Sequence, residues 1–106
     1  MEIKDGTLGG YMSLHERPPA FEGKDGLSYS VDIQCDYLDD ARFGTSLVYV
    51  RWSSSGEEPV GHLETDYLFT EPDADAARTA IGTLLLEDVK SHLDRLIDEK
   101  EEVGDW

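Results

Sequence analysis

The chain has 106 residues, 39% of them hydrophobic and 31% charged, which is the length of one domain and a globular rather than a disordered composition. Its 24 acidic and 9 basic residues give a formal charge of −15, which would repel phosphate backbones and anionic lipids, so neither direct nucleic-acid binding nor membrane binding is expected. The sequence has no signal-peptide pattern, no apolar run of membrane-spanning length, and a single cysteine, Cys35, so we expect a cytoplasmic protein.

Four β-strands are expected in the first two thirds of the chain. The first, at approximately residues 8–15, is weak because Gly9 and Gly10 lie inside it, which is typical of an edge strand with a bulge. The proline-containing stretch 16–26 then reads as a loop. Residues 27–35 are the clearest strand, because apolar and polar residues alternate along them.

The other two strands read as a hairpin. Residues 45–53 are rich in β-branched and aromatic residues and predict a central strand, and a turn-forming stretch leads on to a strand at 59–69. In that last strand, alternation places one set of side chains toward a core and the other toward solvent. The core-facing set is Leu63, Thr65, Tyr67 and Phe69, and the opposite set is His62, Glu64 and Asp66.

A single long helix is expected at approximately residues 71–99. Thr70 and Asp73 have the spacing of a capping box, and apolar residues then recur at helical spacing. Gly82 is unfavourable inside a helix by about 1 kcal/mol relative to Ala, so we expect it at a close approach of the helix to the sheet. The acidic tail, residues 100–106, is expected to fray, with Trp106 either loose or docked.

These elements predict one α+β domain over residues 1–106. Its architecture is a four-stranded antiparallel meander with one long C-terminal helix packed on one face of the sheet.

Specific catalytic motifs are missing from the sequence. His15 and Glu16 begin like a zinc-protease HExxH, but Arg17 and two prolines follow, and no phosphate-binding loop, nucleophile elbow or EF-hand loop is present. The sequence therefore predicts no cofactor and favours a protein without catalytic activity, although it leaves an enzyme open.

The candidate ligand-binding residues are His62, Glu64 and Asp66, with Asp32 or Arg51 contributed by a neighbouring strand. A histidine, carboxylates and an arginine on one surface would suit a small ligand or a divalent metal. His15 and His62 are the pair to test for a metal. The same residues also fit the solvated face that any antiparallel sheet covered on one side presents.

Three functions follow as hypotheses. The first is a small acidic interaction module that binds itself as a homodimer, and a basic protein partner, because the apolar residues exceed what one helix can cover. The second is a small-ligand or metal-binding domain around His62, either a binding protein or an enzyme. The third is an acidic mimic of nucleic acid, for which Asp36, Asp39 and Asp40 are the nearest cluster.

Overall fold

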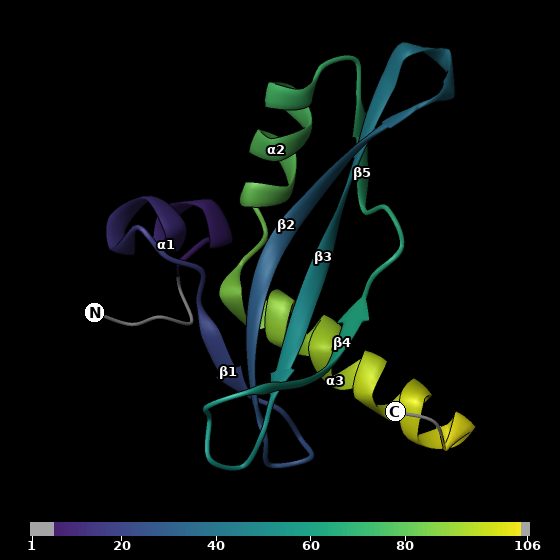
Figure 1. The fold of residues 1–106 in the computed structure, drawn as a ribbon. Coiled ribbons are helices and arrows are strands. Elements are labelled where there is room, and N and C mark those ends of the chain that lie inside the picture. The colour runs from purple at the N-terminus through teal and green to yellow at the C-terminus, as the bar shows by residue number, and fades with distance from the viewer. Residues whose placement is uncertain (1–5, 105–106) are drawn as a thin grey trace.

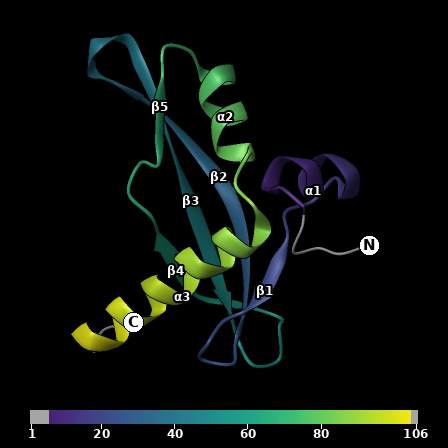
Figure 2. The same cartoon turned by 180° about the vertical axis from the view of Figure 1, so that it is seen from behind.

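The computed structural model describes residues 6–104. It is an α+β fold with an antiparallel sheet and helices on one of its faces, as predicted (Figures 1 and 2). In chain order the elements are α1 (Leu8–His15), β1 (Ala20–Glu22), β2 (Ser28–Leu38), a 3-10 turn (Asp39–Ala41), β3 (Arg42–Trp52), β4 (Pro59–Glu64), β5 (Phe69–Glu71), α2 (Ala74–Gly82) and α3 (Leu86–Val103).

The sheet is a meander in the order β1-β2-β3-β4, with every neighbouring pair antiparallel. β2 and β3 form its long central hairpin, in register from the Tyr29–Arg51 pair to the Leu38–Arg42 pair. β4 pairs with one half of β3, and β5 pairs with the other half at Phe43 to Thr45. β4 and β5 therefore follow the same edge of β3 and form one interrupted edge strand.

The interruption is a bulge, and it corrects the predicted continuous strand at 59–69. Residues 65–68 stand opposite only Ser46 and Leu47, because Glu64 pairs with Val48 and Phe69 pairs with Thr45. The extra length is extruded from the edge, so alternation fails there. Tyr67, expected against the helix, is 46% exposed.

The predicted strand at 8–15 is wrong, because these residues form helix α1. Thr7 caps the helix by accepting a hydrogen bond from the amide of Gly10, and Leu8 is fully buried in the core. The edge strand lies instead at Ala20–Glu22, inside the predicted loop, where it pairs with β2. The prolines that suggested a loop come just before the strand, where they remove no ladder hydrogen bond.

The single long helix predicted for residues 71–99 is two helices. α2 ends at Gly82 and α3 begins at Leu86, because the intervening segment pairs with the N-terminal chain: the amide of Leu8 donates to Leu84, and that of Leu86 donates to Gly6. Gly82 does lie at a close approach, but to Gly9 of α1 rather than to the sheet.

The described part of the tail, predicted to fray from residue 100, belongs to α3. α3 continues to Val103, and Gly104 ends it in the left-handed conformation, with its amide donating to the carbonyls of Lys100 and Glu101. Residues 105–106, including Trp106, lie outside the described residues.

The core lies between the helices and one face of the sheet. Tyr49 spans it, with a fully buried ring and a hydroxyl that donates to the carbonyl of Val89 on α3 at 2.7 Å. The buried apolar cluster is Leu8, Tyr29, Val31, Leu47, Tyr49, Leu63, Ile81, Leu86, Val89, Leu93 and Ile97. None of the helices within residues 6–104 has both the length and the apolar character needed to cross a bilayer.

Candidate functional site

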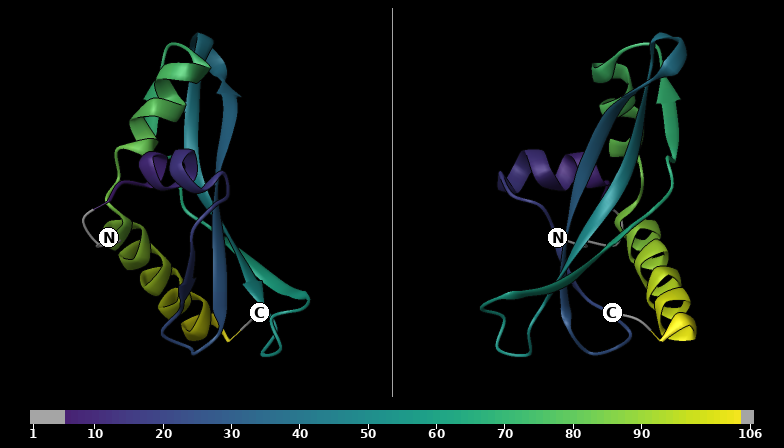
Figure 3. Two further views of the ribbon diagram at one scale, coloured as in Figure 1. Left: turned by 90° about the vertical axis from the view of Figure 1, so that its left-hand side faces the viewer. Right: turned by 45° about the vertical axis from the view of Figure 1, so that its right-hand side comes forward.

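One face of the sheet carries no helix, and we call it the open face (Figure 3). Alternation brings to this face the side chains of β2 and β3 that point away from the core. At its centre lies an apolar stripe along β3, formed by Val48, Val50 and Trp52, all half-buried. The indole N–H of Trp52 donates to the hydroxyl of Ser30 on β2 at 3.0 Å, which holds the ring beside the sheet.

Polar and charged residues flank this apolar stripe on both sides. The strand register places Asp32 of β2 and Glu64 of β4 on either side of Val48, and Ser30 and His62 on either side of Val50. The stripe is thus a narrow apolar band with carboxylates at its borders.

A pocket of about 280 Å³ lies next to the stripe, where the edge strand bulges. β2, β3 and β4 each contribute one side chain to it from the open face, and the bulge supplies the rest of its wall. We call it the acidic pocket, and its lining residues are Asp36, Ser46, Glu64, Thr65, Asp66 and Tyr67.

Hydrogen bonds fix the bulge beside the acidic pocket. The Thr65 amide donates to the carbonyl of Leu47, and the Leu47 amide donates to the Thr65 hydroxyl, each at 3.0 Å. The Thr65 side chain thereby takes the place of a backbone carbonyl in the ladder. The Tyr67 hydroxyl donates to Asp36 at 2.7 Å, and the Tyr67 ring lies over Gly44, where an added Cβ would be only 2.8 Å from it.

Asp36 is held in its charged form. Hydrogen bonds from the Gln34 side chain and from the Tyr67 hydroxyl lower the pKa of its carboxyl below the ordinary value. The same interaction with Asp36 raises the pKa of the Tyr67 hydroxyl. The Asp36 carboxylate at the pocket therefore keeps its negative charge at neutral pH.

The structure brings together part of the predicted site. Glu64 and Asp66 both line the acidic pocket. His62 lies beside Glu64, with 3.5 Å between Nε2 and Oε2, but the two side chains are 68% and 53% exposed. Asp32 shares the open face, separated from Glu64 by β3, so their strands are roughly 10 Å apart.

Arg51, predicted beside these residues, lies instead on the covered face. Its Nε is 3.4 Å from a carboxylate oxygen of Asp25, which also accepts a hydrogen bond from the Tyr29 hydroxyl at 2.6 Å. Asp25 itself caps the turn by accepting from the Leu27 amide. Arg51 therefore belongs to a network that ties the 23–27 turn to the sheet, and not to a ligand site.

The structure places His15 and His62 on separate elements. His15 ends α1, where its ring lies against that of Tyr11 in a tilted arrangement with centroids 4.2 Å apart, whereas His62 lies on β4, beyond β2 and β3 from α1 (Figure 1). Across residues 6–104, no group of three or more His, Cys, Asp or Glu side chains is arranged to hold a metal ion.

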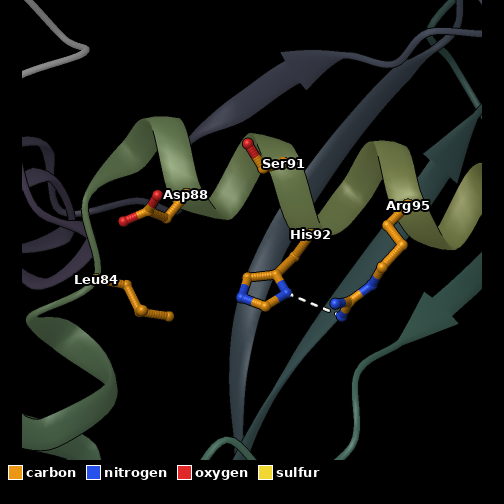
Figure 4. A pocket seen from close by; sticks show the side chains of 5 residues that line it. All are labelled: Leu84, Asp88, Ser91, His92 and Arg95. Atoms are coloured by element: carbon orange, nitrogen blue, oxygen red, sulfur yellow. Dashed lines mark hydrogen bonds between the residues drawn. The ribbon is translucent and has the colours of Figure 1, made fainter.

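A second pocket, of about 430 Å³, lies at the elbow between α2 and α3 (Figure 4). Its lining residues are Leu84, Asp88, Ser91, His92 and Arg95. Burial, together with the charge of Arg95, lowers the pKa of His92, so its Nδ1 accepts from the Arg95 guanidinium at 3.1 Å. Arg95 also lines a cavity on the helix side of the bulge, together with Glu64 and Asp66.

Sequence reasoning missed Asp36, Ser46 and Tyr67 as members of the site. Asp36 continues the alternation of Asp32 and Gln34, so extending the predicted strand from residue 35 to residue 38 would have placed it on the open face. Ser46 and Tyr67 had no such signal, because their proximity depends on the register and on the bulge.

The chain matches no model of a protein family, no curated protein and no solved structure.

Proposed function

We propose that this protein is a non-catalytic interaction module whose open face binds a cationic, amphipathic segment of a partner protein. The observation that carries the proposal is the apolar stripe of Val48, Val50 and Trp52 with Asp32 on one side of it and Glu64 on the other. A complementary segment has apolar side chains at its centre and lysine or arginine at its borders.

The two parts of this surface would contribute differently to binding. Covering the stripe removes apolar area from water. Tryptophan, the residue type of Trp52, is enriched among the interface residues that contribute most of the binding energy. The exposed carboxylates would mainly accelerate association and select partners by charge, and their effect weakens as salt screens it. Binding should therefore weaken with salt without disappearing.

A second copy of the chain is the alternative occupant of the open face. Homodimerisation through this face would cover the same stripe, but it would bring Asp32 and Glu64 of one copy near the like charges of the other. With a formal charge of −15 on each chain, this repulsion favours a basic partner over self-association at low salt.

The other two hypotheses have weaker support. His62 and Glu64 are 68% and 53% exposed, whereas small-ligand sites enclose their ligands, so a small-molecule function would fit the elbow pocket with His92 and Arg95 better. For nucleic-acid mimicry, Asp39 and Asp40 lie in the turn after β2, where they form no extended ridge with the other carboxylates.

The test uses a synthetic peptide of alternating lysine and leucine, titrated against the protein at low and high salt. The double variant Asp32→Asn/Glu64→Gln should bind about tenfold more weakly at low salt. The control variant Glu87→Gln/Glu102→Gln removes the same charge from the exposed surface of α3 and should bind like the wild type. Equal losses of affinity in the two double variants would contradict the proposal, and so would a peptide that does not bind the wild type.

Light scattering on the free protein tests the alternative occupant. We expect a monomer at low salt. A dimer that is lost in Val48→Thr/Val50→Thr would show that a second copy covers the stripe, and would overturn the assignment to a basic partner.

A further inference from the structure

We infer that the acidic pocket is the anchor site for one arginine side chain of the partner segment. This inference rests on the proposed function, because the pocket opens on the same face and next to the apolar stripe. Ser46 is the next residue of β3 on the open face after Val48, so the two positions are roughly 7 Å apart along the strand. An extended partner would span that distance with two residues.

The pocket offers acceptors on several sides. Glu64, Asp66 and Asp36 reach it from the edge strand, from the bulge and from β2. The Asp66 carboxylate accepts no hydrogen bond from any residue in the described range 6–104. Within the same range the Glu64 carboxylate has one polar contact, with the exposed His62 at 3.5 Å. These two carboxylates are therefore available to a donor from outside.

Ser46 gives an independent indication that the pocket receives a polar group. Its side chain lines the pocket although the residue is only 4% exposed, and within residues 6–104 its hydroxyl has no hydrogen-bond partner. The hydroxyl oxygen is open to the pocket, where it can accept a hydrogen bond from a group that enters. A donor that enters the pocket would supply the missing partner.

The arrangement suits a guanidinium better than a metal ion or a compact ammonium. Within the described residues the carboxylates are not close enough to one another to chelate a metal, and about 280 Å³ exceeds what a bare ion needs. A guanidinium is planar and carries five N–H donors in a fixed fork, so it can reach acceptors on several walls at once. An ammonium has three donors at a single point.

The experiment is a double-mutant cycle between the protein and the peptide. One leucine–lysine peptide carries a single arginine, and its partner carries citrulline there, which keeps the shape and removes the charge. In the wild-type protein the citrulline peptide should bind about tenfold more weakly, as expected for lost charge-assisted hydrogen bonds. A third peptide with lysine at that position should fall between the two.

Protein variants place the effect in the pocket. In Asp66→Asn and in Ser46→Ala the difference between the arginine and citrulline peptides should shrink, whereas in Glu87→Gln on α3 it should stay as in the wild type. Asp66 is exposed and Ser46→Ala removes only one oxygen, so both variants should fold.

The outcomes separate the two proposals. If the peptides bind and depend on the stripe, but the arginine–citrulline difference is the same in every variant, the pocket assignment is overturned and the proposed function stands. If no peptide binds the wild type, both are overturned.

Discussion

The hydroxyl of Tyr67 donates to the carboxylate of Asp36 at 2.7 Å, across a separation of 31 residues in the sequence. This bond connects the bulge of the edge strand with β2 and passes over β3, where Gly44 leaves room for the Tyr67 ring. The acidic pocket therefore has a wall that is held in place from the opposite side of the central strand.

Replacing Tyr67 with Phe should raise the pKa of Asp36 toward its ordinary value. The hydrogen bond from Gln34 is the larger cause of the lowered pKa and would remain, so the rise should be partial. NMR titration of the Asp36 carboxyl measures it directly. Gln34→Ala is the matched variant and should give the larger rise, and an unchanged pKa in both would contradict the hydrogen-bonding assignment.

The same variant makes a prediction about stability and pH. Because the folded-state pKa of Asp36 is lowered, its stabilising contribution is fully present above the unfolded pKa of about 3.8, and it is lost as the pH falls through the folded-state pKa. The difference in unfolding free energy between wild type and Tyr67→Phe should thus be largest near neutral pH and should shrink in acid. Chemical denaturation at several pH values measures this difference.

Replacing Thr65 with Val should destabilise the protein by about 1–3 kcal/mol, because the buried amide of Leu47 loses its acceptor while the shape of the side chain is kept. Thr65→Ser retains the hydroxyl and serves as the control. Urea denaturation gives the free energy of unfolding, and hydrogen exchange at the Leu47 amide should accelerate in the Val variant alone. Equal stabilities of the Val and Ser variants would refute this role of the hydroxyl.

Alanine substitutions at Gly9 and Gly82 should have opposite effects, although the two residues face each other. A Cβ at Gly9 would lie 3.2 Å from the Gly82 carbonyl oxygen, so α1 would have to move, whereas a Cβ at Gly82 would meet Gly9 at an ordinary 3.4 Å. Gly9→Ala should lower the melting temperature. Gly82→Ala should leave it unchanged or raise it, since Ala is the better helix former by up to about 1 kcal/mol. A lower melting temperature for Gly82→Ala would show that the contact between Gly9 and Gly82 cannot accommodate a methyl group.

Replacing Arg95 with Ala should raise the pKa of His92. Burial is the larger cause of the lowered pKa and Arg95 the second, so the pKa should recover only in part. A lowered histidine pKa stabilises the folded state above the unfolded value of about 6.5, and this contribution is lost as the pH falls through the folded-state pKa. The Arg95→Ala protein should accordingly lose less stability between neutral pH and mildly acidic pH. NMR titration of His92 in the wild type and in Arg95→Ala tests the assignment, and an unchanged His92 pKa would refute it.

Local patterns were enough to predict the central part of the fold. The alternation in residues 27–35 identified the strand and its buried side chains, and the apolar spacing after residue 73 identified helix and core residues, because burial on one face leaves a period in the sequence itself. Glu64 and Asp66 were likewise predicted as neighbours on one surface. In each case the inference needed only the geometry of one element.

The errors arose where distant segments determine the local conformation. Residues 8–15 are helical, and the C-terminal helix breaks after Gly82, because Thr7 and Leu85 form an antiparallel β-bridge. The periodicity of neither segment predicts this bridge. Arg51 lies on the covered face because it follows the buried Leu47 and Tyr49 at alternate positions of β3, and it is 3.4 Å from Asp25 of a turn that is distant in the sequence.

The sequence by itself thus determined which residues are buried in the strand at 27–35 and that the protein is acidic, because alternation and charge are properties of single segments. Only the tertiary structure decided that Asp36, Ser46 and Asp66 share one pocket, because the register between three strands and a bulge of extra residues bring them together. Those are relations between segments, and hydrogen bonding across the sheet is what sets them.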